Sequence, residues 1–169
     1  MLLLARFENQ KQSLKKEKIY LNTVILDSIS RYSTTIQTKN IQVVTEFKKD
    51  YYIKTDVYLF SIVINNLISN ALKYSDKNTK LAIITTDDDD KIECSIIDSG
   101  IGIASKDISK VFNQFFRSNA TNHPQIKGTG LGLSIVKKLC LLLTIDVQIS
   151  SQESVGTAVT LSYDKEDFK

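Results

Sequence analysis

Hydrophobic and polar positions follow two periods along the chain, one typical of amphipathic helices and one typical of strands. A narrow apolar seam of Leu3, Phe7 and Leu14 predicts a first helix, and Asn22 is the predicted cap of a second. The predicted elements are helices over residues 2–18 and 22–38, strands over 41–47 and 51–54, a helix over 56–74, strands over 81–86 and 92–97, short and long helices over 105–112 and 130–143, and strands over 145–150 and 157–163. This order predicts an α+β fold, a two-layer α/β sandwich whose mixed, mostly antiparallel sheet carries helices on one face.

Composition narrows the class of protein without identifying it. A chain of 169 residues is one domain, or one domain with an appendage, and its net charge of +3 is spread along the chain, so nothing calls for nucleic acid. Cys94 and Cys140 stand alone in apolar stretches, which favours buried thiols in a reducing compartment over a disulfide or metal pair. Leu2–Ala5 is too short for a signal peptide or a membrane span. The acidic run 87–90 lies between two predicted strands and is expected to be a solvated hairpin turn.

Glycines recur at alternate positions in the segment Lys127-Gly128-Thr129-Gly130-Leu131-Gly132-Leu133, which runs directly into an apolar, helix-patterned stretch. Glycine permits positive φ and close backbone approach, and the free N–H groups at a helix start attract anionic oxygens. Lys127 adds a cation at the edge. The segment is therefore a candidate phosphate-binding loop, and an ordinary glycine-rich turn is the alternative.

Asn66, Asn70 and Lys73 are spaced to share one face of the predicted helix over residues 56–74. Asparagine is unfavourable in the middle of a helix and costly to bury, so two on one face indicate a polar role. An amide oxygen suits Mg²⁺, which takes further ligands from water and phosphates, and Lys73 is placed to reach a phosphate. The alternative is a solvated polar stripe.

Asp98 ends a β-branched strand and is followed by Gly100 and Gly102. A carboxylate at a strand end, beside flexible backbone, can accept a hydrogen bond from an exocyclic amine such as that of adenine. An Asp-Ser-Gly turn is the alternative.

An aromatic cluster, residues 111–117, ends in Arg117 and precedes a polar stretch with the only proline, Pro124, and the only histidine, His123. The pattern predicts a mobile loop anchored by aromatic residues. Packing of the phenylalanines in the core explains at least part of it.

The order and spacing of these four segments resemble the N, G1, F and G2 boxes of sensor histidine kinases. The matching stretches are Asn-x-x-x-Asn-Ala-x-Lys-Tyr from Asn66, Asp-x-Gly-x-Gly from Asp98, Phe-x-x-Phe-Phe-Arg from Phe112, and Gly-Thr-Gly-Leu-Gly-Leu from Gly128. The resemblance covers about residues 41–161. It implies the catalytic ATP-binding domain of that family, within the wider superfamily of gyrase, heat-shock chaperone and mismatch-repair ATPases.

The resemblance implies ATP and Mg²⁺ as cofactors, with Asn70 and Asn66 as the metal residues. The expected catalytic residues are Lys73, Arg117 and Lys127. The residues expected to contact the nucleotide are Asn66, Asn70, Lys73, Tyr74, Asp98, Gly100, Gly102, Ile103, Phe115, Gly128, Thr129, Gly130, Leu131, Gly132 and Leu133.

A mobile ATP lid is implied over about residues 104–127, with Phe112, Phe115 and Phe116 as its aromatic hinge. Its closure would exclude water and bring cations near the transferred phosphoryl group.

Four positions depart from the usual family pattern. Gln114 stands where an arginine is frequent, which removes one phosphate contact. Leu59 and Ile62 replace polar residues, so this flank of the helix is expected to be more buried or to pack on a partner. Ser154 replaces a frequent glycine near the closing strand.

Residues 1–22 resemble the end of the second helix of a dimerisation and phosphoacceptor domain, and residues 23–169 resemble the catalytic domain. The phosphoaccepting histidine of the family lies on the first helix of the former domain, whereas His123 falls in the expected lid. The resemblance therefore implies a fragment that does not autophosphorylate on histidine by itself. Its expected partners are its own dimerisation and phosphoacceptor domain and a response regulator receiver domain, with no nucleic acid. The full-length protein is expected to be a homodimer with this domain in the cytoplasm, and a membrane anchor stays open.

In the implied reaction the γ-phosphoryl of ATP passes in line to an imidazole nitrogen, so this domain mainly positions groups and neutralises charge. Three other functions stay open. A superfamily ATPase is disfavoured because its general-base glutamate would occupy the position of Asn66, and an amide cannot take that proton. An anti-sigma-factor-type serine kinase shares the boxes, and a non-catalytic nucleotide-binding module would act through the N-terminal segment.

Overall fold

The structure is a computed structural model that describes residues 14–118 and 126–165. A five-stranded sheet forms one of its layers. The strands lie in the order β2 (Gln42–Phe47), β4 (Lys80–Asp87), β5 (Lys91–Asp98), β7 (Gly156–Asp164) and β6 (Asp146–Gln152). The pair β2–β4 is parallel and the other pairs are antiparallel. The predicted mixed, mostly antiparallel sheet is confirmed.

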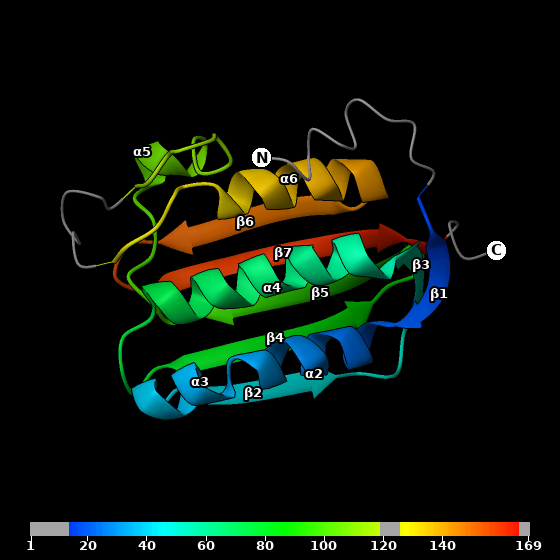
Figure 1. Ribbon diagram of the computed structural model, residues 1–169, viewed down its shortest axis with the longest axis horizontal. Coiled ribbons are helices and arrows are strands. Elements are labelled where there is room, and N and C mark those ends of the chain that lie inside the picture. The colour runs from blue at the N-terminus through cyan, green and yellow to red at the C-terminus, as the bar shows by residue number, and fades with distance from the viewer. Residues whose placement is uncertain (1–13, 119–125, 166–169) are drawn as a thin grey trace.

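The second layer is made of helices that all cover the same face of the sheet, as Figure 1 shows. Its members are α2 (Leu21–Arg31), α3 (Ser33–Lys39), α4 (Val57–Tyr74) and α6 (Gly132–Leu143). The short α5 (Ser105–Ile108) contacts β6 near one end of the sheet. The two-layer sandwich predicted from the pattern is therefore confirmed.

Helix α4 lies over the middle of the sheet, between α6 and the pair α2 and α3 (Figure 1). It begins after Asp56, whose side chain accepts a hydrogen bond from the backbone N–H of Leu59 at 3.2 Å. Leu59 is fully buried and Ile62 is half-buried, as the loss of polar residues on this flank predicts. The buried side chains occupy one face of α4 and leave Asn66, Asn70 and Lys73 on another; they are Leu59, Phe60, Val63, Ile64, Leu67, Ile68, Ala71 and Leu72.

The first element in the described part of the chain is a strand. Strand β1 (Lys16–Tyr20) pairs antiparallel with β3 (Tyr52–Asp56), so the predicted helix over residues 2–18 is wrong at 16–18, and residues 1–13 lie outside the described part. The pairing is reinforced by Tyr20 and Tyr52, whose ring centroids lie 4.2 Å apart. The strand that pairs with β1 lies more than thirty residues away, so the local sequence carries no sign of the pairing. The charged pattern of the segment therefore indicated a helix instead.

Two predictions about the next helix are also wrong. Asn22 lies inside α2 instead of capping it, because its amide donates to the carbonyl oxygen of Lys49 at 3.0 Å and to the carboxylate of Asp50 at 2.7 Å. The expected single helix over 22–38 is interrupted at Tyr32, whose φ of −105° and ψ of 13° are not helical. The Tyr32 hydroxyl donates to a carbonyl oxygen of α4, so a tertiary contact accompanies this break.

Two helices near the site are shorter than predicted. The helix predicted over residues 105–112 ends at Ile108 and continues as turns. The helix predicted from residue 130 begins at Gly132, because the preceding Gly130 has a φ of 71° that a right-handed helix does not allow.

Cys94 and Cys140 are both free and buried, as expected, and burial raises the pKa of each thiol to about 12. The acidic run forms the β4–β5 hairpin turn, but only Asp88, Asp89 and Asp90 are exposed. The Asp87 carboxylate accepts from Lys49, Lys165 and Lys48, and these bonds hold its pKa well below its ordinary value.

No helix in the described ranges 14–118 and 126–165 is long and apolar enough to cross a bilayer.

Helix α6 ends at Leu143, and the next residue, Thr144, adopts the left-handed conformation with φ 62° and ψ 42°. This conformation is rare and strained for a β-branched residue. We expect Thr144→Gly to raise the free energy of unfolding by about 1 kcal/mol, measured by urea denaturation. The matched control is Asn40→Gly at the end of α3, where φ is 50°. Asparagine tolerates this conformation, so the gain there should be only a few tenths of a kcal/mol, and equal gains at both positions would contradict the argument.

Candidate functional site

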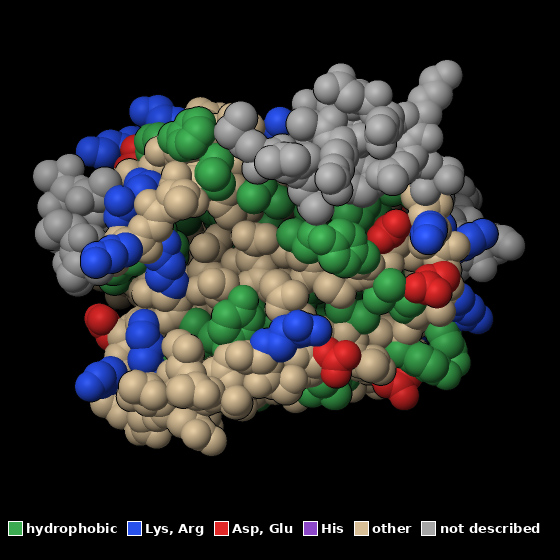
Figure 2. All heavy atoms as spheres, in the orientation of Figure 1, with side chains coloured by type: hydrophobic (Ala, Val, Ile, Leu, Met, Phe, Trp, Pro, Cys, Tyr) green, Lys and Arg blue, Asp and Glu red, His purple; other side chains and the backbone are tan. Residues whose placement is uncertain are grey.

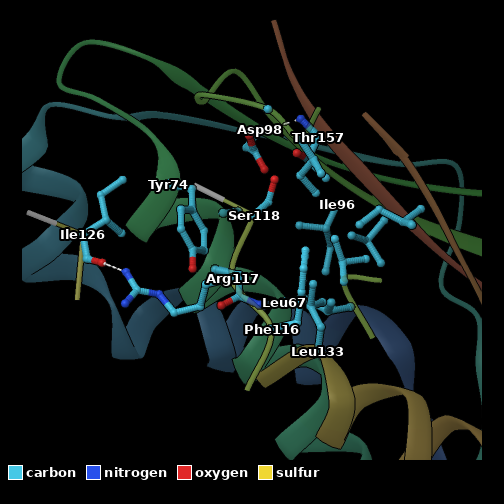
Figure 3. Close-up of a pocket in the computed structure, with 17 residues that line it drawn as sticks. Leu67, Tyr74, Ile96, Asp98, Phe116, Arg117, Ser118, Ile126, Leu133 and Thr157 are labelled. Carbon is cyan, nitrogen blue, oxygen red and sulfur yellow. Dashed lines mark hydrogen bonds between the residues drawn. The ribbon is translucent and has the colours of Figure 1, made fainter. Parts of the chain in front are cut away.

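One cavity of about 100 Å³ brings together side chains from stretches far apart in the sequence. It lies between α4, the ends of β5 and β7, and the segment that contains Phe116 and Arg117 (Figure 3). Asp98 and Asn70 both line it, together with five other residues expected to act at the site, Tyr74, Gly102, Ile103, Arg117 and Leu133. The remaining lining residues are mostly apolar: Leu67, Ala71, Ile96, Val111, Phe116, Ser118, Ile126, Ile149, Thr157 and Val159.

Asp98 is the last residue of β5 and, among the residues that the structure describes, the only carboxylate that lines this cavity. Its Oδ1 accepts from the backbone N–H of Gly100 at 2.9 Å and from that of Thr157 at 3.3 Å. No group within residues 14–118 and 126–165 donates a hydrogen bond to Asp98 Oδ2, so that oxygen can accept from a ligand. Burial raises the pKa of Asp98 to about 6, and the two backbone bonds oppose that rise.

The loop after Asp98 is fastened to the end of α4. The backbone N–H of Ile101 donates to the carbonyl oxygen of Tyr74 at 3.1 Å. Gly100 packs on the same carbonyl, and a Cβ there would collide with it. This contact places Tyr74 and Asp98 on the wall of the same cavity, as Figure 3 shows.

The polar face of α4 meets the start of α6. A Cβ at Gly132 would lie 3.1 Å from Asn66 Oδ1 and 3.5 Å from the Asn70 amide nitrogen, so both amides lie against the first residue of α6. Asn66 donates from Nδ2 to the carbonyl oxygen of Ile62 at 2.8 Å, which leaves its Oδ1 as an acceptor. Helix α6 has no side-chain cap, so its first N–H groups remain available to an anion.

Cations gather beside this cavity. Lys73, Lys127 and Lys39 line an adjoining cavity of about 400 Å³ that shares Tyr74 and Ile126 with the first. Figure 2 shows that lysine and arginine side chains predominate at this end of the helical face. Such a distribution favours a polyanionic ligand whose charged part leaves the first cavity on this side.

Lys73 also contacts the glycine-rich segment. Its ammonium lies so close to Gly128 that a Cβ there would collide with it, and it lies 4.8 Å from the centre of the Tyr74 ring. Lys39 donates to the carbonyl oxygens of Leu72 and Ser75, both at 2.7 Å, and so binds the end of α4.

The predicted lid is described over residues 104–118 and at 126–127, and residues 119–125 with His123 lie outside the described part. The guanidinium of Arg117 donates to the carbonyl oxygen of Ile126, which brings the two described ends of this segment together (Figure 3). The backbone of Phe115 bonds to that of Gly130 at 2.9 Å. Phe115 has a φ of 63° and is 65% exposed, so Phe116 and not Phe115 lines the cavity.

The other predicted contact residues surround the cavity without lining it. Asn66 and Gly132 lie at its α4–α6 side, and the exposed Gly128 and Thr129 lie beside Lys73 and Lys127. Gly130 and Leu131 connect this segment to α6.

Ser118 and Thr157 line the cavity, although no sequence argument singled them out. Thr157 faces Asp98 because β5 and β7 pair with these two residues in register. Ser118 carries the only side-chain hydroxyl that the segment 112–118 contributes to the cavity. Thr157 lies in the predicted closing strand, but only the strand pairing places it opposite Asp98. Ser118 belongs to no recognisable local motif, so only the path of the chain could have revealed it.

Comparisons with known proteins agree with this geometry. Residues 55–167 match the family described as "Histidine kinase-, DNA gyrase B-, and HSP90-like ATPase". The chain therefore belongs to this family, in which it has the form of the catalytic ATP-binding domain of a sensor histidine kinase.

Two curated relatives align with nearly the whole chain. The chain is 32% identical over 162 residues to the sensor protein kinase GraS of Staphylococcus aureus (strain Newman). The aligned region covers 96% of this chain and 46% of GraS. The chain is 30% identical over 162 residues to the sensor-like histidine kinase SenX3 of Mycolicibacterium smegmatis, and this alignment covers 96% of the chain and 42% of SenX3. The chain thus spans less than half the length of these relatives.

Solved structures share the fold. The catalytic domain of histidine kinase ThkA superposes with a TM-score of 0.78 at 26% identity, covering 89% of this chain and 98% of that domain. Full-length ShkA in complex with AMPPNP gives a TM-score of 0.81 at 19% identity, covering 95% of this chain and 33% of ShkA.

The raised pKa of Asp98 yields a stability prediction. Because this pKa rises from 3.8 to about 6 on folding, the ionised carboxylate destabilises the fold fully above about pH 6 and not at all below about pH 3.8. We expect Asp98→Asn to raise the free energy of unfolding by on the order of 2 kcal/mol at about pH 8, and to change it little near pH 4.

Urea denaturation at the two pH values measures both effects. Asp76→Asn, which changes an exposed carboxylate just after α4, is the control and should show no such gain at the higher pH. A gain of equal size at both pH values for Asp98→Asn would contradict burial of the charge as its cause.

Proposed function

We propose that this chain binds ATP with Mg²⁺ and delivers the γ-phosphoryl group to a histidine on a separate domain, as the ATP-binding part of a protein-histidine kinase. The observation that carries the proposal is that Asp98 and Asn70 line one cavity, with cations beside it. An acceptor for a base at one end and polar and cationic groups at the other suit a nucleotide.

Adenine would occupy the apolar part of the cavity. The Asp98 carboxylate has Oδ2 available to accept from the exocyclic amine, and Oδ1 is held by two backbone N–H groups. Tyr74, Ile103 and Leu133 supply apolar surface around it. A buried acceptor with fixed orientation discriminates strongly between bases, because the wrong base would leave it unpaired.

The amide oxygens of Asn70 and Asn66 fit a hard cation that keeps several waters and takes other ligands from phosphates. Asn66 suits this role because its Nδ2 is engaged within α4, which directs Oδ1 away from the helix backbone. When bound, Mg²⁺ would supply neutralisation of the phosphate charge. Among the described residues no group of three carboxylate, histidine or cysteine side chains is placed to hold a metal ion.

Lys73, Arg117 and Lys127 are the proposed catalytic residues, because a phosphoryl transfer of this kind depends on positioning and on stabilising charge. Lys73 reaches the glycine-rich segment, and Lys127 lies beside it in the adjoining cavity. Arg117 lines the first cavity and joins the ends of the described lid through Ile126. The free N–H groups of α6 would bind phosphate oxygens next to these cations.

Transfer is favoured over hydrolysis by Asn66. Hydrolytic members of the superfamily place a glutamate there as the general base for water. Asn66 cannot accept a proton, and its Nδ2 is already bonded to Ile62.

The receiving histidine would belong to a dimerisation and phosphoacceptor domain, and the next acceptor to a response regulator receiver domain. A structure of histidine kinase ThkA in complex with response regulator TrrA shares this fold, with a TM-score of 0.78 at 22% identity, covering 99% of this chain and 47% of that chain. We propose that residues 1–22 lead toward the phosphoacceptor domain, that the whole protein is a homodimer, and that this domain works in the cytoplasm. Strand β1 packs residues 16–20 of that segment against β3.

Calorimetric titration with a non-hydrolysable ATP analogue tests the site. We expect Asn70→Ala to lose most of the gain in affinity that Mg²⁺ confers, about tenfold, while retaining Mg²⁺-free binding. Asn65→Ala is the matched control, because Asn65 lies on the same helix but lines neither cavity. An equal loss in both variants, or no loss in Asn70→Ala, would count against the metal assignment.

Incubation with γ-labelled ATP tests the direction of transfer. We expect no base-stable label on this chain alone, because His123 is its only histidine and lies in the predicted lid. The full-length protein should acquire a base-stable, acid-labile label, and Lys73→Met should reduce its rate at saturating ATP. A base-stable label on this chain that is absent from His123→Ala would overturn transfer to a separate domain.

A further inference from the structure

The proposed reaction gives no role to one hydrogen bond at the wall of the cavity, the bond between Ser118 and Asp107. The Ser118 hydroxyl donates to Asp107 Oδ2 at 2.6 Å, and Asp107 is only 9% exposed. Asp107 lies on α5, and Ser118 lies eleven residues after Asp107 in the chain, directly after Arg117. Ser118 lines the cavity and Asp107 does not, so the carboxylate stands behind the hydroxyl.

This bond decides what the hydroxyl can offer to a ligand. A serine hydroxyl has one hydrogen to donate and two lone pairs that accept, whereas an ionised carboxylate only accepts. The separation of 2.6 Å is typical of a hydroxyl that donates to a charged oxygen. With its hydrogen directed at Asp107, Ser118 presents only lone pairs to the cavity.

Ser118 and Asp98 lie at the same end of the cavity. Figure 3 shows the Ser118 hydroxyl and the Asp98 carboxylate pointing into the same region, beside Thr157 and Tyr74. Asp98 Oδ2 also accepts only, so this end offers two acceptors from two different elements of the fold. A purine with an amino group at position 6 has two N–H donors on one nitrogen, whereas a 6-oxo purine presents an oxygen that neither acceptor can bind.

We propose that Ser118 is a specificity-determining residue that accepts from the purine 6-amino group together with Asp98, and that Asp107 is the positioning residue that keeps the hydroxyl in its accepting orientation. The inference rests on the proposed nucleotide site and adds a base-selecting pair to it.

Calorimetric titration with ADP and IDP tests the pair without any phosphoryl transfer. The quantity of interest is the ratio of the IDP to the ADP dissociation constant. We expect Ser118→Ala to lower this ratio about fivefold, the effect of one lost hydrogen bond. Ser118→Thr keeps the hydroxyl and should retain the ratio.

Asp107→Asn is the sharper variant. The asparagine amide can donate to Ser118, which frees the hydroxyl hydrogen to point into the cavity toward a 6-oxo group. The ratio should then fall further than in Ser118→Ala, through tighter IDP binding as well as weaker ADP binding. Ser109→Ala, an exposed serine of the same segment, is the control and should leave the ratio unchanged.

The outcomes separate this inference from the proposed function. If the parent chain binds neither nucleotide, the nucleotide site itself is wrong. If the parent prefers ADP but Ser118→Ala and Asp107→Asn keep the parental ratio, or weaken both nucleotides equally, the selecting role is overturned and the nucleotide site stands. Circular dichroism of each variant confirms that the compared proteins are folded, and Ser118→Thr provides the comparison if the alanine variant is not.

Discussion

The hydrogen bond between Ile101 N–H and the Tyr74 carbonyl joins the two halves of the site, and the rest of the cavity depends on it. It ties the end of the central helix to the loop that leaves the sheet after Asp98. Lys39 reinforces the same helix end by donating to the carbonyl oxygens of Leu72 and Ser75. Groups at helix termini need such partners, and here they also hold the residues proposed to bind the base and those proposed to bind the phosphates in one arrangement.

The site combines groups that are costly to a folded protein. A carboxylate is buried with its pKa raised, several cations lie together, and helix α6 begins without a side-chain cap. The proposed nucleotide would offset all of these at once, because its base would supply donors to Asp98 and its phosphates would supply negative charge to the lysines and to the helix start. Under this proposal, ligand binding and fold stability are linked through the same residues.

The sequence predicted the parts of the structure that local pattern determines. The face of α4 with Asn66, Asn70 and Lys73, the strand that ends at Asp98 and the apolar helix α6 follow from spacing and residue type. Strand β1 and the roles of Asn22 and Asp87 depend on partners more than twenty residues away, so no local pattern could indicate them. The Ser118–Asp107 bond and the outward turn of Phe115 depend on how one irregular segment folds back on itself.

The pairing of β1 with β3 ties the start of the described chain to helix α4. Asp56 closes β3 and caps α4, and its second carboxylate oxygen accepts from the backbone N–H of Lys15. These bonds anchor residues 15–20 to the first turn of a helix of 18 residues, about 27 Å long. Asn70 and Lys73 lie toward the opposite end of that helix, so one continuous element joins β1 to the residues proposed to bind the phosphates.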